Sequence, residues 1–275
     1  MAIDRIFPVV TARDAAATIE LTLASLREFT EVIVYDFGSR DSTREICAGY
    51  PNVQLVDGDF LGGGRTRNHA ASLAEGDWIF ALDADEFLSD GLLASLRDLS
   101  LEQLDAAYSV HRHNLFMGKD IRWGGWGNEW RARLYNRHRY QFSDATVGER
   151  LVLASDTRVA PLKGALWHEA VPSLDVLMRD IGRRASLRQN AATKAVSPPL
   201  IAIRAIAAFW YSYLLKLGLL EGWRGLVIAV AASVETFFRL MQRYADRGRP
   251  LPRSATEAPG STEGISRPTL GPGPS

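Results

Sequence analysis

The sequence predicts an α/β fold, with a mostly parallel central sheet and flanking helices, followed by C-terminal amphipathic helices. Strand-like and helix-like segments alternate four times in the first third of the chain, and two long apolar segments follow residue 200. The 275 residues are 47% hydrophobic and 23% charged, which is typical of a globular protein with a large core. This composition excludes disordered, collagen-like and repeat proteins.

The alternation is clearest up to residue 86, where short apolar runs are followed by segments with helical spacing of apolar residues. The predicted strands are 6–10, 31–36, 52–56 and 78–82, and the predicted helices are 15–29, 41–48 with Asp41 as N-cap, and 65–75. Ligands of parallel sheets bind at the carboxyl ends of the strands. Asp36, the loop 62–64 and the pair Asp83 and Asp85 are all expected at those ends.

Three regions follow from composition. Residues 1–171 are predicted to form the α/β domain, and the part from residue 106 is rich in Arg, His, Trp and Gly, as expected for recognition of a second substrate. Residues 172–247 are predicted to be helical, and residues 248–275 to form a disordered tail of Pro, Gly, Ser and Thr.

Two C-terminal segments, 201–220 and 225–244, are apolar and helical in spacing. Their longest uncharged runs, 205–215 and 225–234, are short against the roughly 20 residues that cross a bilayer. Helices lying in a membrane surface fit the pattern, and two core helices packed on each other are the alternative. We expect membrane contact, because aromatic residues suited to an interface and an excess of basic residues occur together.

The net charge of zero conceals an asymmetry. Residues 179–249 hold twelve Lys and Arg against four Asp and Glu, a net charge of +8, so the remainder carries −8. The basic region favours phosphate-rich partners such as lipid headgroups. Nucleic-acid binding is not expected, because its Arg residues are interleaved with long aliphatic runs.

The single cysteine, Cys47, excludes a disulfide within the chain and indicates a reducing compartment. Residues 1–5 contain Asp4 and Arg5 and no long apolar run, so no secretory signal is expected. We therefore expect a cytoplasmic protein, peripheral on the inner face of the cell membrane.

Asp83 and Asp85 directly follow a buried-type strand. Two carboxylates at a strand end can share one Mg²⁺ or Mn²⁺ ion, which would also bind a substrate diphosphate. An acidic turn that caps the next helix is the alternative interpretation.

Asp36 can accept hydrogen bonds from a nucleobase or ribose, or can serve only as a turn residue. The loop Gly62-Gly-Gly64 runs into a helix that carries Arg65 and Arg67, an arrangement that favours an anion such as a diphosphate. It lacks the Gly-Lys-Ser/Thr of a P-loop and the spacing of a dinucleotide fingerprint.

These segments together resemble glycosyltransferase family 2, which has the GT-A fold. The motifs are Thr11-Ala-Arg-Asp, Val32-Ile-Val-Tyr-Asp-Phe-Gly-Ser-Arg-Asp-Ser-Thr, Arg67-Asn-His-Ala and Gly76-Asp-Trp-Ile-Phe-Ala-Leu-Asp-Ala-Asp-Glu. Three later motifs, Asn114-Leu-Phe-Met-Gly-Lys, Gly124-Gly-Trp-Gly-Asn-Glu-Trp and Leu217-Gly-Leu-Leu-Glu-Gly-Trp-Arg-Gly-Leu, resemble the subgroup that includes lipopolysaccharide-core β-glucosyltransferases. The resemblance covers about residues 3–245.

The resemblance implies a role for each matching residue. Glu129 would be the general base, at a position where the subgroup usually has Asp, although an ion pair with Arg131 or Arg133 is the alternative. A nucleotide-sugar donor would be bound by Thr11, Arg13, Asp36, Arg67, Asn68 and Asp83. The metal ligands would be Asp83, Asp85 and His168, with Asp85 closer than Asp83. Trp123, Trp126 and Trp130 would stack on an acceptor glycan or glycolipid, with at least one of them in the core instead.

The implied reaction is an inverting, metal-assisted transfer of a hexose to a hydroxyl of a cell-envelope glycolipid or polysaccharide. The acceptor hydroxyl must lose its proton as it attacks an oxocarbenium-like carbon, which calls for one base. Gly148 stands where the subgroup has His, which affects acceptor specificity more than the reaction class. Two alternatives remain open: a non-catalytic nucleotide-binding protein at the membrane, and a sugar nucleotidyltransferase, although the latter would need a glycine in the loop after the first strand.

Overall fold

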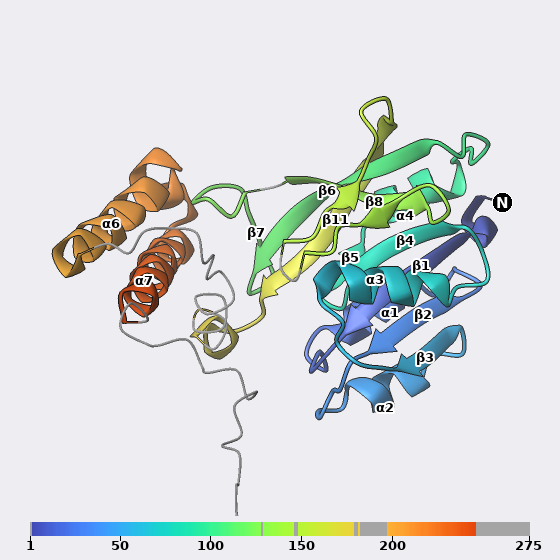
Figure 1. Cartoon of the computed structure of the whole chain (residues 1–275), viewed down its shortest axis with the longest axis horizontal. Coiled ribbons are helices and arrows are strands. Elements are labelled where there is room, and N and C mark those ends of the chain that lie inside the picture. The colour runs from blue at the N-terminus through green and yellow to red at the C-terminus, as the bar shows by residue number, and fades with distance from the viewer. Residues whose placement is uncertain (1, 128, 146–147, 179–180, 182–196, 246–275) are drawn as a thin grey trace, which may run out of the picture.

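The computed structural model describes residues 2–127, 129–145, 148–178, 181 and 197–245. Figure 1 shows a large sheet flanked by helices, with a helical hairpin set beyond one end of it. The predicted α/β fold with a central sheet, flanking helices and C-terminal helices is confirmed. The predicted tail 248–275 lies outside the described residues.

The sheet has the order β3-β2-β1-β4-β8-β6-β11-β5, and β7 pairs with β6. Its strands are β1 (Ile6–Ala12), β2 (Val32–Asp36), β3 (Val53–Asp57), β4 (Trp78–Asp83), β5 (Glu86–Leu88), β6 (Ala106–Phe116), β7 (Lys119–Ile121), β8 (Glu129–Asn136) and β11 (Arg158–Val171). A separate antiparallel pair consists of β9 (Gln141–Phe142) and β10 (Leu151–Val152). The helices are η1 (Ala2–Arg5), α1 (Ile19–Ser25), α2 (Thr43–Ala48), α3 (Gly63–Ser72), α4 (Asp90–Arg97), α6 (Pro198–Trp210), η2 (Tyr211–Leu215), η3 (Gly218–Glu221) and α7 (Trp223–Ala245).

The N-terminal half of the sheet is parallel, as the alternation of strands and helices predicts. β1 pairs in parallel with both β2 and β4, and β2 with β3. β1, β2 and β4 are almost continuously buried, because helices cover both faces of a parallel sheet, whereas the edge strand β3 is only partly buried. In register, Ala12 lies opposite Asp36 and Thr11 opposite Asp83, so the three carboxyl ends meet at one edge.

The other half of the sheet is mixed. β8 runs antiparallel to both β4 and β6, β6 is parallel to β11, and β5 closes the sheet antiparallel to β11. The pairing of β6 and β8 shifts between Tyr108, opposite Leu134, and Ser109, opposite Ala132. Arg133 is therefore an extra residue in a β-bulge, a device that redirects a side chain.

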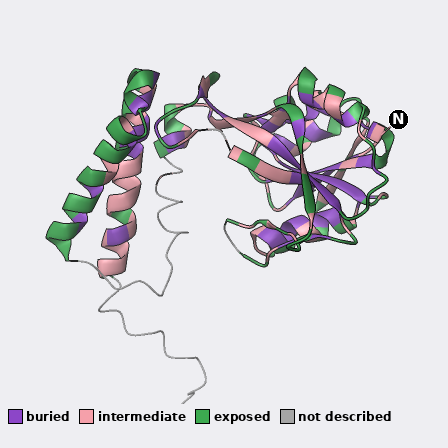
Figure 2. Ribbon diagram, turned by 90° about the horizontal axis from the view of Figure 1, so that it is seen from above, coloured by how far each residue is buried: buried purple, intermediate pink, exposed green. Residues whose placement is uncertain are grey.

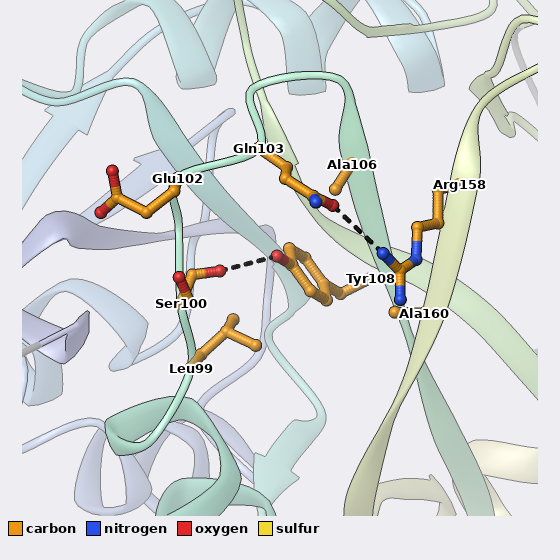
Figure 3. A pocket seen from close by; sticks show the side chains of 8 residues that line it. All are labelled: Leu99, Ser100, Glu102, Gln103, Ala106, Tyr108, Arg158 and Ala160. Carbon is orange, nitrogen blue, oxygen red and sulfur yellow. Dashed lines mark hydrogen bonds between the residues drawn. The ribbon is translucent and has the colours of Figure 1, made fainter.

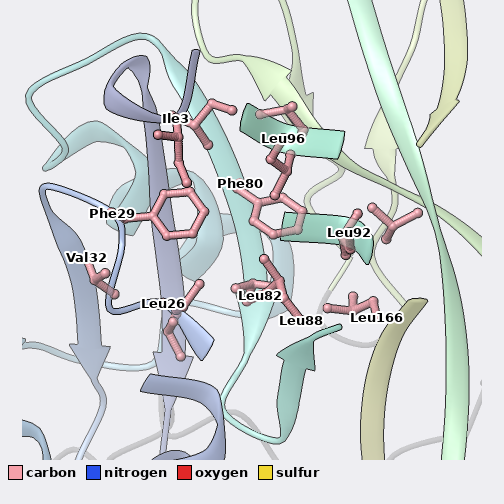
Figure 4. Close-up of a cluster of buried hydrophobic side chains, with 14 of the residues drawn as sticks. Ile3, Leu26, Phe29, Val32, Phe80, Leu82, Leu88, Leu92, Leu96 and Leu166 are labelled. Atoms are coloured by element: carbon pink, nitrogen blue, oxygen red, sulfur yellow. The ribbon is translucent and has the colours of Figure 1, made fainter. Parts of the chain in front are cut away.

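Two apolar clusters fill the two faces of the sheet. In the first, α1 and α4 pack against β4 and β11 through residues that include Leu26, Phe29, Phe80, Leu92 and Leu166 (Figure 4). The second joins β1, β2 and β4 to α3 on the opposite face, through alanines of that helix. The strand ends with their polar residues lie beyond these clusters, so a rigid core supports the edge.

Helix lengths differ from the predictions. The predicted helix 15–29 is α-helical only over α1, because tighter turns flank it: the Thr18 N–H donates to the Ala15 carbonyl before α1, and the Leu26 N–H donates to the Leu23 carbonyl after it. The predicted helix 201–220 ends as α6 and then the π-helical turn η2. Leu217 adopts a left-handed conformation, φ 57°, that stops the helix.

The closed end of the hairpin is joined to the sheet domain by close packing of glycines. A Cβ at Gly124 would lie 3.5 Å from the Gly218 Cα, and a Cβ at Gly225 would overlap the carbonyl oxygen of Gly218. The Ser212 hydroxyl donates to the carbonyl of Gly124 at 2.6 Å, and the Gly124 N–H donates to the Lys216 carbonyl at 2.8 Å. Two of the three segments that carry the subgroup resemblance, those that begin at Gly124 and Leu217, therefore pack against each other.

Candidate active site

The turn between Asp83 and Asp85 is held from several sides. Thr18 and Thr22 of α1 both donate to the carbonyl of Ala84, at 3.0 and 3.1 Å. The N–H of Glu169, in β11, donates to the Asp85 carbonyl at 2.9 Å. The two carboxylates thus project from a fixed backbone at the carboxyl edge of the sheet.

Asp83 lies between two arginines. One oxygen accepts from Arg67 of α3, and the other accepts from Arg133 of the bulge at 3.0 Å. Burial raises the pKa of Asp83, but the two guanidinium groups outweigh it and hold the pKa well below its usual range. Asp83 is therefore an anion that fixes two cations at the site.

Asp85 faces His168 rather than an arginine. The His168 Nε2 lies 3.4 Å from Asp85 Oδ2, and Asp85 Oδ1 is buried with no hydrogen-bond partner among the described residues. Burial lowers the pKa of His168, but the facing carboxylate outweighs it, so the pKa is raised. Asp85 and His168 are therefore electrostatically coupled across the turn.

Asn114 fixes the orientation of the His168 ring. Its amide nitrogen donates to the Trp126 carbonyl at 2.7 Å, so the amide oxygen is the atom that faces His168 Nδ1 at 2.6 Å. Nδ1 then bears the hydrogen in the neutral ring, and the lone pair of Nε2 points toward Asp85. A histidine whose other nitrogen is held in this way is typical of metal sites.

The residues at this turn fit a divalent cation in part. A carboxylate oxygen and an imidazole nitrogen, as Asp85 and His168 provide, are of the donor types that Mn²⁺ takes in proteins. Both oxygens of Asp83 are taken by arginines instead. Within the described ranges, no three His, Cys, Asp or Glu side chains gather closely enough to hold a metal ion by themselves.

Glu129 lies at the start of β8, half-buried. Its Oε1 accepts from Arg112 of β6 at 2.6 Å and from Arg131 at 2.8 Å. Its Oε2 forms no hydrogen bond with the described residues. Partial burial raises the pKa of Glu129, but the two guanidinium groups outweigh it and lower the pKa. Glu129 is therefore ionised at neutral pH, with one oxygen available to a ligand.

Glu86 is the hub that joins these groups, and the sequence analysis did not single it out. It is fully buried, and its Oε1 accepts from Arg112 at 3.0 Å and Arg133 at 2.6 Å, while Oε2 accepts from the backbone of Asp83 at 3.0 Å. A chain of ion pairs thus runs from Glu129 to Asp83. Its position next to Asp85 was the only signal in the sequence.

Asp36 is buried and binds its own turn. Its Oδ1 accepts from the N–H groups of Gly38 and Ser39, both at 2.8 Å, which is the turn interpretation of this residue. Its Oδ2 is buried without a partner among the described residues. This oxygen departs from the rule that a buried carboxylate oxygen is hydrogen-bonded.

The other predicted donor residues differ in exposure. Thr11 is partly buried beside Asp83 in register, and Arg13 is exposed with its guanidinium 3.8 Å from Asp14. Both amide atoms of Asn68 bind the backbone of Phe142, at 2.8 and 2.9 Å. Asn68 thus fastens α3 to β9.

Arg67 has a further partner that the sequence analysis did not place in the site. Its Nε donates to Glu149 at 2.9 Å, across a loop that follows β9. Glu149 belongs to the segment that departs from the subgroup pattern at Gly148. Arg67 is thus held between the carboxyl edge of the sheet and this loop.

The three candidate tryptophans have different surroundings. Trp126 packs on Phe116 in the cluster that joins the hairpin to the sheet, so it is the core member of the three. Trp123 is exposed. Trp130 is also exposed and stacks on His111, with ring centroids 4.9 Å apart, on the face of the sheet opposite its neighbour Glu129.

A pocket of about 330 Å³ lies elsewhere, between the loop 99–103 and the first residues of β6 and β11 (Figure 3). Tyr108 and Arg158 line it, and each is hydrogen-bonded to that loop. It lies at the amino ends of these parallel strands, and it contains none of the predicted site residues. The carboxyl edge is the position where sheets of this type bind ligands.

Comparison with known proteins agrees with the features of this edge. A family model, Glycosyl transferase family 2, matches residues 9–155. A TPR repeat-containing protein of Synechococcus elongatus, Synpcc7942_0270, is 38% identical over 110 residues, which are 39% of this chain and 27% of that protein. The chain thus spans about a quarter of that relative's length.

Solved structures of S. aureus TarS are similar at low sequence identity. TarS 1–349 in complex with UDP-GlcNAc is 14% identical with a TM-score of 0.41, covering 88% of this chain and 92% of that one. The same fragment with UDP is 14% identical with a TM-score of 0.40, covering 88% and 91%. Because the family model spans more than half of the chain, from within β1 to just beyond β10, the chain belongs to glycosyl transferase family 2.

Proposed function

We propose that the protein is an inverting glycosyltransferase that moves a sugar from a nucleotide-sugar to a hydroxyl of a cell-envelope glycolipid or polysaccharide. Family membership supports the reaction class. The observation that carries the proposal is the chain Glu129, Arg112, Glu86, Arg133, Asp83, which joins the candidate base to the donor edge. Base and donor carboxylate are therefore positioned as one unit.

In the proposed reaction, Glu129 Oε2 takes the proton of the acceptor hydroxyl as its oxygen attacks the anomeric carbon. The bond from that carbon to the diphosphate breaks, and its electron pair leaves with the nucleoside diphosphate. One displacement inverts the configuration. In this proposal Arg67 and Arg133, which are paired with Asp83, would turn part of their charge toward the leaving group.

Asp85 and His168 would hold a divalent cation, Mg²⁺ or Mn²⁺. Such an ion neutralises charge on the leaving diphosphate. Asp83 would not be a metal ligand in this proposal, because its two oxygens bind Arg67 and Arg133. Asp36 Oδ2 is available to the nucleoside, and Thr11 lies next to Asp83 on the donor side.

Within the family, we assign the chain to the lipopolysaccharide-core β-glucosyltransferase-like subgroup. The support is that residues 114–135 supply Asn114, which orients His168, and Glu129. The second subgroup segment, from Leu217 to Leu226, packs against Gly124. The acceptor class follows from this assignment, with exposed Trp123 as the tryptophan placed to meet an acceptor.

The test begins with binding of nucleoside diphosphates, measured by titration calorimetry with and without Mn²⁺. We expect one diphosphate to bind in a metal-dependent manner. Asp85→Ala should weaken it at least tenfold, and Asp156→Ala, an exposed aspartate far along the chain, should not. Glu129→Gln should keep this binding and reduce release of nucleoside diphosphate on envelope extracts by about 10²-fold or more.

Two outcomes would contradict the proposal. Failure of every diphosphate to bind under either condition would remove the donor site. Metal-dependent binding of a nucleotide-sugar that never turns over with any envelope fraction would favour a non-catalytic nucleotide-binding protein.

A further inference from the structure

The helical hairpin exposes two apolar stripes. On α6 and η2 the exposed apolar residues recur every three or four positions, and α7 has a second such set near its start. Figure 2 shows exposed residues along both helices. The first stripe is Leu200, Ile203, Ile206, Trp210 and Leu214, and the second is Trp223, Leu226 and Val230. We call these residues the hairpin stripes.

The hairpin is not a buried core element. Only 17% of the window Pro198–Leu215 and 28% of Trp223–Ala245 is buried, although both are apolar and long enough by composition and length to cross a membrane. A contiguous exposed apolar surface of this kind marks an interaction site. The occupant must be apolar where it meets the stripes.

The closed end of the hairpin is bound to the sheet domain. The buried Glu221 carboxylate accepts from the N–H groups of Arg122 and Trp123, at 2.9 and 3.2 Å, and the Arg224 guanidinium donates to the Phe116 carbonyl at 3.2 Å. Together with the bond from Ser212 to Gly124, these contacts fix the turn between the two helices on the domain.

This attachment argues against a spanning hairpin. If the helices crossed a bilayer, their open ends, Pro198 and Ala245, would lie on the side away from the sheet domain. Leu177 belongs to the apolar cluster that contains residues of both α7 and the sheet domain. Residues 179–197, which connect Leu177 to α6, would then also have to cross the bilayer. That segment contains five Lys and Arg residues, which are strongly disfavoured in a bilayer core.

Charge identifies the surface that the hairpin fits. The hairpin, residues 197–245, holds five Lys and Arg against two Glu, a net charge of +3, whereas residues 1–178 hold 18 Lys and Arg against 26 Asp and Glu, a net charge of −8. An anionic bilayer therefore attracts the hairpin and repels the rest, which sets the orientation of the molecule. A symmetric dimer through the stripes would bring two such basic regions together.

We propose that the α6 and α7 hairpin lies in the plane of an anionic lipid bilayer, with the hairpin stripes in the acyl boundary and the basic side chains among the headgroups. Glu129 follows Gly124, at the docked end of the hairpin, by five residues, at most about 18 Å of chain. Resting on the proposed function, this places the candidate base within reach of an acceptor anchored in that bilayer.

Flotation of the full chain with vesicles tests the proposal. We expect it to float with phosphatidylcholine vesicles that contain phosphatidylglycerol, at least tenfold more weakly with phosphatidylcholine alone, and more weakly at high salt. Ile206→Asp with Trp210→Asp should abolish flotation. The matched control is Val152→Asp with Leu104→Asp on the sheet domain, where exposures of 58% and 51% match the 58% and 50% of the hairpin residues, and it should float like the wild type.

Nucleoside diphosphate binding, retained by both double variants, shows that they fold and separates this test from that of the transfer reaction. Three results would overturn the proposal. In the first, the wild type floats with neither kind of vesicle. In the second, light scattering without lipid shows a wild-type dimer and a monomeric Ile206→Asp, Trp210→Asp variant. In the third, the membrane-bound chain resists alkaline extraction. The second would assign the stripes to another copy, and the third would indicate a spanning hairpin.

Discussion

The carboxylates of Glu86 and Glu129 share one guanidinium, that of Arg112, which donates to them at 3.0 and 2.6 Å from its two terminal nitrogens. One of these carboxylates is fully buried and the other is half-exposed at the candidate site. Because Glu86 also binds Arg133 and the backbone of Asp83, a change at this buried residue is transmitted to both ends of the chain of ion pairs.

Glu86→Ala should destabilise the protein strongly. It leaves Arg112 and Arg133 without their buried partner, and removal of one member of a buried pair costs about 3–5 kcal/mol. Glu86→Gln keeps the shape and an acceptor oxygen, so its cost should be smaller. Urea unfolding followed by circular dichroism measures both.

Glu102→Ala is the matched control, because Glu102 pairs with Arg5 at 3.3 Å in an exposed position. Its effect should be within about 1 kcal/mol of zero. Equal unfolding midpoints for Glu86→Ala and Glu102→Ala would refute a structural role for the buried hub.

The pH dependence of transfer should reflect the lowered pKa of Glu129. A base whose pKa is depressed stays ionised as the pH falls below the ordinary range of glutamate, so the acid limb of kcat/KM should lie below that range. Arg131→Gln removes one of the two cations and should move the limb to higher pH. Initial rates across a pH series, with Arg44→Gln at an exposed pair as control, measure this. An acid limb at the same pH in wild type and Arg131→Gln would contradict the assignment of Glu129 as the base.

The carboxyl edge could be predicted from the sequence because a parallel sheet brings its strand ends together. Asp36 and Asp83 needed only the alternation of strands and helices to be placed on the same edge. The helix ends were less predictable: the apolar periodicity runs on through Leu26 and Phe29, but the backbone changes there to i→i−3 turns, which the side-chain pattern does not distinguish from a helix.

The partners of the site residues could not be predicted for a similar reason. Arg112 and Arg133 follow Glu86 in the sequence by 26 and 47 residues and lie in other strands. A β-bulge directs the side chain of Arg133. Asn68 matches a donor-site motif, yet its amide binds the backbone of Phe142, 74 residues away. The pattern identified the right segment, and only the packing of segments distant in sequence decides which atoms remain free.

The thiol of Cys47 should be unreactive in the folded protein. Cys47 is fully buried in α2, and burial together with the nearby Asp36 raises the pKa of the thiol to about 11. At pH 8 only about one thiol in a thousand would be ionised, and the thiolate is the reactive form. Labelling with a chromogenic disulfide should therefore be slow in buffer and complete in guanidinium chloride. Rapid labelling of the native protein would show that α2 opens easily.

Ser212→Ala should loosen the hairpin from the sheet domain. The buried Ser212 hydroxyl donates to the Gly124 carbonyl at 2.6 Å, so its removal leaves a buried acceptor unpaired, at a cost of about 1–3 kcal/mol. Ser95 is the matched control, because its exposed hydroxyl also donates to a backbone carbonyl, that of Lys163, at 2.9 Å. Water can replace that bond, so Ser95→Ala should cost less.

Thermal unfolding and limited proteolysis after η2 measure the difference. Faster cleavage in Ser212→Ala alone is expected, and equal cleavage in the two variants would mean that this bond does not hold the hairpin in place.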